Sequence, residues 1–387
     1  MKLLFLSNYY THHQHPTCKM WNKLTNNNFI FAATEEFSLD RKKLGWRQQN
    51  EVSFVRFFGD EISRDNENII ENSDVVILGN APLKMISTRL KKDRIVFKYS
   101  ERVYKSKYHR WKWLPRVYTF WRNYGRHKSL YLLSASAFTT YDFARHGTFL
   151  GKTYKWGYFP ETRHYNIDRL LGQKDYAKIL WCGRFLDWKH PDIAIQLARR
   201  LKAEGITFSL DFIGTGEMED FLRQGVEKYD LTEYVSFLGS MSSEEVRSYM
   251  EKAGIFLFTS DFREGWGAVL NESMNSGCAV VASHAIGSVP FLIQHNENGL
   301  IYVNESFDDF YNKVKFLLIH PDKQKKFGEK AYATITNLWN AELAAERFLK
   351  LAEEVADHGY CDLYSEGPCS IAPVIKNDWF KEYNYDY

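Results

Sequence analysis

Residues 263–272 read Arg-Glu-Gly-Trp-Gly-Ala-Val-Leu-Asn-Glu, and they decide the fold because they join a short apolar run at 255–260 to a segment with helical periodicity. Two carboxylates stand eight positions apart, Glu264 in the connecting loop and Glu272 about one turn into the helix. The amides between them surround a helix N-terminus, which is a ready site for an anion. A phosphate there, flanked by carboxylates that accept hydrogen bonds from hydroxyl groups, is the arrangement that a nucleotide sugar needs. A solvated glutamate beside a glycine-rich turn explains the spacing about equally well, because short motifs carry a high false-positive risk.

Two cations follow the first apolar run of the second half of the chain. Residues 181–189 read Trp-Cys-Gly-Arg-Phe-Leu-Asp-Trp-Lys, with Arg184 and Lys189 five positions apart. An arginine fork and a lysine point charge can together hold a diphosphate, and open α/β sheets bind ligands at the carboxyl ends of their strands. If this stretch stood alone, two surface cations on a loop would be the better interpretation.

A Gly-x-Gly turn, Gly214-Thr215-Gly216, ends another apolar run. It could begin a dinucleotide-binding fingerprint, but Glu219 stands where the third glycine of that fingerprint belongs. A tight turn from strand to helix explains the two glycines nearly as well.

Short apolar runs alternate with amphipathic stretches along the whole chain, which predicts βαβ units and parallel sheets. The runs lie at 3–7, 29–33, 52–57, 75–79 and 95–99, then at 179–182, 208–214, 235–239, 255–260, 279–283 and 300–303. A turn-rich stretch at 151–173 separates the two sets. We therefore predict an α/β protein of two Rossmann-like domains that face each other across a cleft. The predicted domains are 1–170 and 171–369, with an aromatic segment at about 370–387 packing back on the first domain.

Several motifs occur jointly in the second half. Gly183-Arg184 with Lys189, Ile213-Gly214-Thr215-Gly216, Phe237-Leu238-Gly239 and Glu264-x7-Glu272 are followed by Gly-Cys-Ala-Val-Val-Ala-Ser at 277–283 and by Asn298-Gly299-Leu300. In order and spacing they resemble the group 1 glycosyltransferases, that is glycosyltransferase family 4, which have the two-domain GT-B fold. The resemblance covers about residues 178–350. The N-terminal half matches only in its alternating pattern, as expected if it holds the acceptor.

The resemblance implies a retaining, metal-independent transfer of a sugar from a nucleotide sugar, with a UDP-sugar favoured. The acceptor would be a glycan or a lipid-linked molecule in bacterial-type surface polysaccharide or glycolipid biosynthesis. Arg184 and Lys189 would hold the donor diphosphate, Glu264 the hydroxyls of the transferred sugar, and Glu272 the ribose hydroxyls. The other implied donor contacts are Gly265, Trp266, Gly267, Ala268, Val269, Gly214, Gly216, Gly239, Ser240 and Met241. Trp266 replaces the usual phenylalanine, which keeps an aromatic wall but could alter the sugar preference.

The loop after the first apolar run is rich in histidine. Residues 8–16 read Asn-Tyr-Tyr-Thr-His-His-Gln-His-Pro, and the Gly-Gly pair that the family usually carries there is absent. His12, His13 and His15 could contact the acceptor or act as a general base, and plain loop histidines are a comparable interpretation. Because no second Cys/His cluster and no Asp-x-Asp triplet accompanies them, we expect no metal and no cofactor.

A basic and aromatic segment spans residues 102–128, with nine Lys or Arg, two His, eight aromatic residues and no Asp or Glu. Tryptophan and tyrosine favour the headgroup level of a bilayer, and each cation near an anionic surface contributes roughly 1 kcal/mol. Pro115 can open a helix that runs to Arg126 and is amphipathic enough to lie in an interface. We predict an anionic membrane surface as partner and no nucleic acid. The alternative is a basic helix whose aromatic residues pack on the first sheet.

The composition excludes several classes of protein. The 387 residues are 44% apolar and 26% charged with a net charge of +3, unlike a disordered or collagenous chain. No apolar run approaches the ~20 residues that span a bilayer, the start lacks a signal-peptide core, and five cysteines without metal spacing favour a reducing compartment. We therefore expect a cytoplasmic protein, peripheral at the inner face of the cell membrane. The alternatives are a nucleotide-sugar epimerase or phosphorylase on the same fold, a non-catalytic membrane or nucleic-acid adaptor and, least favoured, a dinucleotide oxidoreductase.

Overall fold

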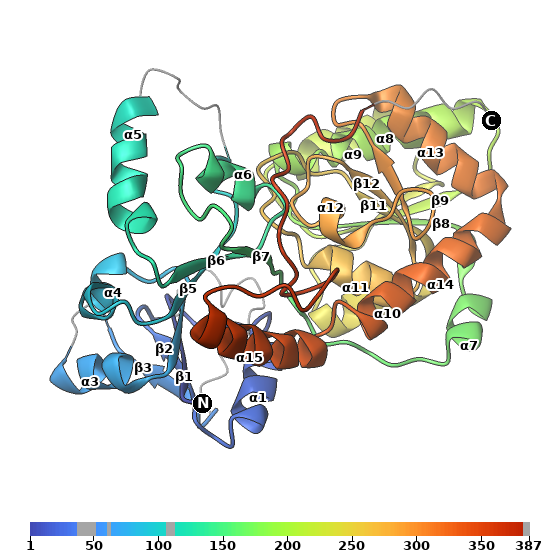
Figure 1. Cartoon of the computed structure of the whole chain (residues 1–387). Helices are drawn as coiled ribbons and strands as arrows, with labels where there is room; N and C mark the ends of the chain where they lie inside the picture. The colour runs from blue at the N-terminus through green and yellow to red at the C-terminus, as the bar shows by residue number, and fades with distance from the viewer. Residues whose placement is uncertain (37–51, 60–62, 106–112, 382–387) are drawn as a thin grey trace. The chain divides into compact units, whose positions relative to one another are not determined.

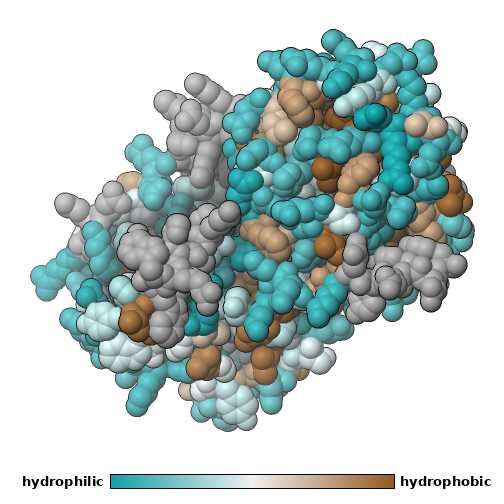
Figure 2. Space-filling view, turned by 90° about the horizontal axis from the view of Figure 1, so that it is seen from above, coloured by the Kyte–Doolittle hydropathy of each residue, from teal (hydrophilic) through white to brown (hydrophobic). Residues whose placement is uncertain are grey.

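A computed structural model describes residues 1–36, 52–59, 63–105 and 113–381 of the chain (Figure 1). The chain divides into two compact units, of which the first combines Met1–Glu161 with Trp339–Lys376 and the second combines Thr162–Leu338 with Asn377–Tyr387. Within the described ranges, no helix is both long and apolar enough to cross a membrane. The face drawn in Figure 2 is largely hydrophilic, and its hydrophobic residues lie in small separate groups, as on ordinary protein surfaces.

The first unit is built on a parallel sheet of seven strands in the order β3-β2-β1-β4-β5-β6-β7. The strands are β1 (Leu3–Ser7), β2 (Phe29–Ala33), β3 (Val55–Phe57), β4 (Val75–Leu78), β5 (Val96–Ser100), β6 (Leu130–Ser134) and β7 (Thr153–Lys155). Successive side chains of a strand point to opposite faces, so an apolar strand can be covered on both. In β1, Leu4 and Leu6 enter one core, whereas the Phe5 ring meets the Trp21 ring at 6.2 Å.

Helices cover the sheet of the first unit. They are α1 (His15–Leu24), α3 (Arg64–Asn72), α4 (Ser87–Lys91), α5 (Trp113–Phe120), α6 (Thr139–Ala144) and α15 (Ala341–His358), with a 3₁₀ turn at Leu83–Ile86 and a π-helical turn at Trp121–Gly125. Helices α3, α4 and α6 contribute Ile70, Leu90 and Phe143 to the core that holds Leu4. Helices α1 and α15 pack on each other.

The second unit holds a parallel sheet of six strands in the order β10-β9-β8-β11-β12-β13. The strands are β8 (Asp175–Cys182), β9 (Ser209–Ile213), β10 (Val235–Phe237), β11 (Ala253–Phe258), β12 (Ala279–Ser283) and β13 (Leu300–Tyr302). The helices are α7 (Ile167–Gly172), α8 (Asp192–Ala203), α9 (Glu219–Lys228), α10 (Ser243–Lys252), α11 (Val269–Asn275), α12 (Val289–Leu292), α13 (Phe307–Ile319) and α14 (Pro321–Asn337), with a 3₁₀ turn at Asp187–Lys189. Helices α8, α9 and α13 share one core with the strands, and α11 packs on α10 and α14.

These two parallel sheets confirm the predicted α/β fold with two Rossmann-like domains. Each predicted apolar run overlaps an observed strand. Strands β6 and β7 were not predicted: β6 follows the basic segment, and β7 lies inside the stretch expected to be a linker.

The predicted domain boundaries differ from the observed ones at α15. The sequence-based division kept 339–369 with the second domain, whereas Trp339–Lys376 belongs to the first unit. The reason is aromatic packing: the Phe348 ring of α15 lies 5.1 Å from the Trp21 ring and 5.1 Å from the Phe97 ring. Helical periodicity identifies an apolar face but does not tell which core that face joins.

The C-terminal segment divides between the two units. Residues up to Lys376 belong to the first unit, as predicted, where the Ala372 amide donates to the Thr153 carbonyl at 2.9 Å. From Asn377 onward the chain belongs to the second unit, which corrects the prediction that the whole segment packs on the first domain. There the Trp379 indole donates to the His284 carbonyl at 3.0 Å. Residues 382–387 lie outside the described ranges.

Candidate functional site

The strand order of the second unit reverses direction between β8 and β11. These neighbouring central strands pair in parallel, so their following loops leave the same edge of the sheet. Open α/β sheets bind ligands at such a switch point. The loop after β8 carries Arg184 and Lys189, and the loop after β11 carries Glu264. The structure therefore brings the two strongest sequence motifs to one edge.

The glycines after β9 hold the loop after β8 in place. The Gly183 amide donates to the Ile213 carbonyl at 3.0 Å, and the Phe185 amide to the Thr215 carbonyl at 2.9 Å. Gly214 has a φ of +132°, and a Cβ there would lie 1.9 Å from the Gly183 carbonyl oxygen. A glycine is needed at 214 for this close approach, so the Gly-x-Gly turn supports the loop that carries the cations.

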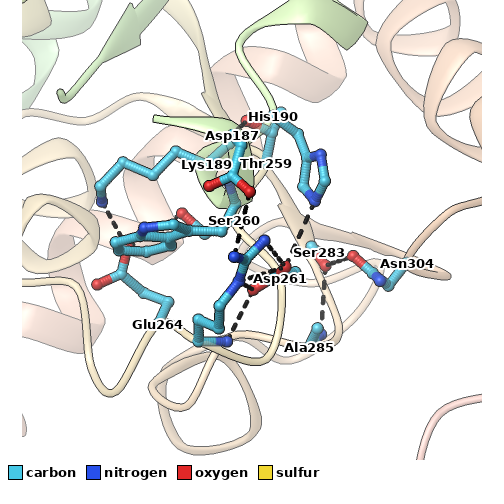
Figure 3. Close-up of polar contacts among 12 residues, drawn as sticks. Asp187, Lys189, His190, Thr259, Ser260, Asp261, Glu264, Ser283, Ala285 and Asn304 are labelled. Carbon is cyan, nitrogen blue, oxygen red and sulfur yellow. Dashed lines mark hydrogen bonds and ion pairs between the residues drawn. The ribbon is translucent and has the colours of Figure 1, made fainter. Parts of the chain in front are cut away.

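Lys189 and Glu264 form the central ion pair of the site (Figure 3). Lys189 Nζ lies 2.6 Å from Glu264 Oε2, and the Ser260 hydroxyl donates to the same oxygen at 3.0 Å. The two charged side chains are 16% and 13% exposed. The ammonium also lies 4.6 Å from the centre of the Trp188 ring, which favours a cation.

Arg184 is the other predicted clamp residue. Its side chain is exposed, and no described residue forms an ion pair with it. The structure thus places Arg184 on the same loop as Lys189 but pairs only Lys189 with a carboxylate.

A second set of contacts connects the same two loops beside the central pair (Figure 3). Arg263 contacts Asp261 at 2.9 Å and Asp187 at 3.2 Å, and His190 Nε2 lies 3.6 Å from Asp261 Oδ2. Burial by itself would raise the pKa of Asp261, but the interactions with His190 and Arg263 outweigh it and lower that pKa to about 2. The contact with Asp261 raises the pKa of His190 above its ordinary value. The loop after β11 is therefore fixed to the loop after β8 by charges that do not include Lys189 or Glu264.

Glu272 lies in the first turn of α11. Its side chain is half-buried, and its carboxylate has no hydrogen-bond partner among the described residues. Burial raises the pKa of Glu272, and the nearby positive charges of Arg247 and Arg163 oppose that shift. Arg247 of α10 is held there by a hydrogen bond of 2.6 Å to Asn275 Oδ1, and Asn275 lies in α11 with Glu272. The arrangement leaves a carboxylate with free acceptor capacity.

Cys182, at the end of β8, is close enough to both Glu272 and Lys189 for their charges to affect the pKa of its thiol. Burial raises the pKa of the Cys182 thiol to about 12, with a further rise from Glu272 and an opposing effect of Lys189. The thiol therefore lies within electrostatic reach of both charges, and it stays protonated at neutral pH. Sequence reasoning did not single out Cys182, because one cysteine in a strand end gives no signal of its own.

The backbone of the segment between the two glutamates has a conformation that depends on Gly267. Gly267 has a φ of +80°, and a Cβ there would lie 2.2 Å from the Phe258 ring. Gly265 precedes it, Ala268 caps α11, and Val269 begins the helix. Trp266, expected to form an aromatic wall, is 0% exposed.

The Trp266 indole donates to Asn271 Oδ1 at 2.9 Å inside the core. Its ring therefore does not line the site in this conformation. The buried indole instead fixes the loop after β11 to the core. Any effect of Trp266 on the sugar preference therefore has to act through the backbone of that loop.

Gly239, Ser240 and Met241, which the resemblance implied as donor contacts, follow β10 at the same edge of the sheet. The Gly214 amide donates to the Gly239 carbonyl at 2.8 Å, Ser240 is exposed and Met241 is half-buried. In the order β10-β9-β8 these residues are two strands away from the loop with the cations, which is about 10 Å at a strand spacing of 4.8 Å.

The three histidines of the first unit lie after β1, and α1 begins at His15. The His12 and His13 ring centres are 3.9 Å apart, the His13 ring stacks on Tyr158 at 5.9 Å, and His15 Nδ1 lies 2.9 Å from the Tyr10 hydroxyl. Burial, with a smaller effect of His12, lowers the pKa of His13 to about 3. The lowered pKa makes His13 a poor general base near neutral pH, which favours contact over proton abstraction for this residue.

Sequence reasoning missed a buried lysine of the first unit. Lys98 lies in β5, and its Nζ donates to the Gly79 carbonyl at 2.5 Å, just after β4. Burial lowers the pKa of Lys98 to about 8. A lysine inside an otherwise apolar strand was the available signal.

The described residues contain no group of three or more His, Cys, Asp or Glu that could hold a metal ion. All five cysteines are free thiols.

In a comparison with known proteins, the second unit matches one family model. Residues 166–334, all within the second unit, match the family model described as glycosyl transferases group 1. The amylovoran biosynthesis glycosyltransferase AmsK of Erwinia amylovora is 35% identical over 127 residues, which are 32% of this chain and 31% of AmsK. A GDP-mannose-dependent alpha-(1-6)-phosphatidylinositol monomannoside mannosyltransferase of Mycobacterium tuberculosis is 24% identical over 46% of this chain and 47% of its own length.

Among solved structures, Anabaena HepE in complex with UDP superposes with a TM-score of 0.68 over 92% of this chain and 99% of HepE, at 15% identity. This likeness shows the GT-B fold, as predicted. The chain spans about a third of the length of AmsK.

Proposed function

We propose that the chain is a glycosyltransferase that moves a sugar from a nucleotide-sugar donor, a UDP-sugar in the first instance, onto a glycan or lipid-linked acceptor. The observation that carries the proposal is the ion pair of Lys189 with Glu264 at the switch point of the second sheet. The match of the same unit to the group 1 family supports it. The first comparison, AmsK, is a glycosyltransferase of amylovoran biosynthesis, and we propose surface polysaccharide or glycolipid biosynthesis for this chain too.

Each charged group of the site has a role in the proposal. Arg184, which is exposed and has no ion pair with a described residue, binds the donor diphosphate together with Lys189. Glu264 accepts hydrogen bonds from hydroxyls of the transferred sugar once Lys189 turns to the diphosphate. Glu272, whose carboxylate keeps free acceptor capacity, binds the ribose hydroxyls.

We propose a retaining reaction without a metal ion, in the manner of glycosyltransferase family 4. The acceptor hydroxyl attacks on the face from which the nucleotide departs, and its proton passes to the departing phosphate. Arg184 and Lys189 offset the charge that develops on that phosphate, a form of stabilisation that often supplies the largest part of catalysis. Because His13 is neutral and weakly basic, we assign the histidine loop to acceptor contacts.

A nucleotide-release assay tests the proposal. The full chain is incubated with a panel of UDP- and GDP-sugars, with and without a membrane extract as acceptor. We expect release of nucleotide from one donor only when acceptor is present, unchanged release in EDTA, and a product with the anomeric configuration of the donor. Isomerised nucleotide sugar without any release would instead indicate an epimerase, and the absence of turnover with every donor would contradict an enzymatic role.

A further inference from the structure

Helix α5 of the first unit exposes three large apolar side chains on one side. Leu114 is 71% exposed, Tyr118 61% and Trp121 51%. Their spacing of four and three residues places them on one helical face. The Tyr118 and Trp121 ring centres lie 6.4 Å apart, so this face continues from α5 into the π-helical turn.

The opposite face of the same helix already fills the core. The Phe120 ring lies 5.5 Å from Phe143, and the Tyr124 ring lies 5.7 Å from Phe149. The sequence left open whether the aromatic residues of this segment face a membrane or the first sheet, and the structure divides them between two faces. Leu114, Tyr118 and Trp121 are therefore not needed for the packing of α5 on its unit.

Positive charge borders the exposed residues. Arg122 follows Trp121 directly and Arg126 ends the π-helical turn; both are exposed, and among the described residues neither forms an ion pair. Between residues 102 and 160 the one acidic residue is Asp142. It is 1% exposed, and it faces Arg102 at 3.7 Å. The segment therefore offers cations and no exposed carboxylate.

We propose that the surface formed by Leu114, Tyr118, Trp121, Arg122 and Arg126, here called the α5 face, binds the anionic surface of a lipid bilayer. Amphipathic aromatic rings suit the headgroup level, and cations attract acidic headgroups. A second copy of the chain fits less well, because a two-fold interface sets each patch against itself and would oppose cations to cations. Of the segment 102–128, residues 106–112 lie outside the described ranges and are not part of the argument.

Sedimentation with vesicles tests the α5 face. The full chain is mixed with phosphatidylglycerol/phosphatidylcholine vesicles and with phosphatidylcholine vesicles. We expect binding to the first kind that weakens with added salt, and weak binding to the second. The Arg122→Gln, Arg126→Gln variant should lower the partition constant about 30-fold at low salt, because roughly 1 kcal/mol per lost cation is about fivefold each. The Leu114→Ser, Tyr118→Ser, Trp121→Ser variant should abolish the binding that remains at high salt.

Matched control variants carry the same kinds of substitution on α9 and α14 of the second unit. Lys325→Gln, Lys326→Gln removes two exposed charges from α14, and Phe221→Ser removes a side chain that is 61% exposed on α9. Both controls should bind vesicles like the wild type. Unchanged far-ultraviolet circular dichroism and melting temperature of the α5 variants show that the surface substitutions leave the fold intact.

Three results would overturn the proposal. The first is wild-type protein that stays in the supernatant with both kinds of vesicle. The second is α5 variants that bind as the wild type does, or that lose no more than the controls. The third is a wild-type dimer that the α5 substitutions dissociate, since the face would then be covered by a second copy. Because the test does not use a sugar donor, it is independent of the proposed glycosyl transfer.

Discussion

Lys189→Ala and Glu264→Gln should change the affinity for nucleoside diphosphate in opposite directions, because the two side chains bind each other in the ligand-free protein. Their charged atoms are 2.6 Å apart, and both side chains are mostly buried. Such a charge-assisted hydrogen bond contributes about 1.5–3 kcal/mol net, or roughly 10- to 100-fold in an equilibrium constant. Loss of the ammonium removes a diphosphate contact of that strength. Loss of the carboxylate charge frees the ammonium, so affinity should rise about three- to tenfold, since the glutamine oxygen keeps part of the hydrogen bond.

Isothermal titration of UDP or GDP, whichever binds the wild type, measures both changes. Lys178→Ala is the matched control, because Lys178 forms an ion pair of 3.2 Å with Asp211 in the same unit, and its affinity should equal that of the wild type. Turnover should fall about 100-fold or more in both site variants, the scale seen when a preorganised charge-stabilising group is lost. If Glu264→Gln weakens nucleotide binding as much as Lys189→Ala, Glu264 contacts the nucleotide and its assignment to the sugar is wrong. Wild-type affinity in Lys189→Ala would refute the diphosphate clamp.

Three further outcomes follow from the same site. Arg184→Ala should cut turnover about 100-fold with unchanged circular dichroism, because the side chain is exposed and has no ion pair with a described residue; near-normal transfer would remove Arg184 from the clamp. Glu272→Gln should mainly raise the donor KM with little change in kcat, because contacts to a remote ribose bind substrate and transition state nearly equally; a fall in kcat alone would contradict this role. The raised pKa of His190 means that its pairing with Asp261 stabilises the fold below the unfolded pKa of about 6.5 and ceases to do so as the pH rises through the folded value. Melting temperatures should therefore show a deficit of His190→Ala at pH 6 that shrinks by pH 9, and an equal deficit at both would refute the pairing. On the acid side, the low pKa of Asp261 means that its contribution is present above about pH 4 and lost as the pH falls towards 2.

The fold could be predicted where a local pattern is sufficient. A run such as 279–283 is apolar at its first four positions because both faces of a parallel sheet are covered, and the observed β12 has these bounds. Strand β7 has three residues and lies among turn residues, too short for any pattern to show. The assignment of α15 to the first unit depends on Phe348 meeting Trp21 and Phe97, contacts between residues more than 240 positions apart. No property of the helix alone contains that information.

The same distinction holds for the candidate site. Lys189 and Glu264 were predictable because each follows an apolar strand, and neighbouring parallel strands bring their following loops to one edge. The burial of the Trp266 indole was not predictable, because loop conformation decides whether an aromatic side chain faces a ligand or the core. Lys98 was missed because its ammonium is bound by the Gly79 carbonyl, which directly follows the neighbouring strand β4.

The core of the second unit fixes the backbone of Lys189 and leaves its side chain able to change partners. The Trp181 indole, 3% exposed in β8, donates to the Thr259 hydroxyl at 2.8 Å, and that hydroxyl donates to the Lys189 carbonyl at 2.5 Å. Thr259 lies directly after β11, so the chain from indole to carbonyl connects both strands of the switch point. Among the described residues, the ammonium contacts Glu264 and the Trp188 ring face, both of which it can leave by rotating about its own side-chain bonds. Exchange of a carboxylate for a diphosphate then requires no movement of the backbone, and the ordering cost of donor binding is confined to a few side chains.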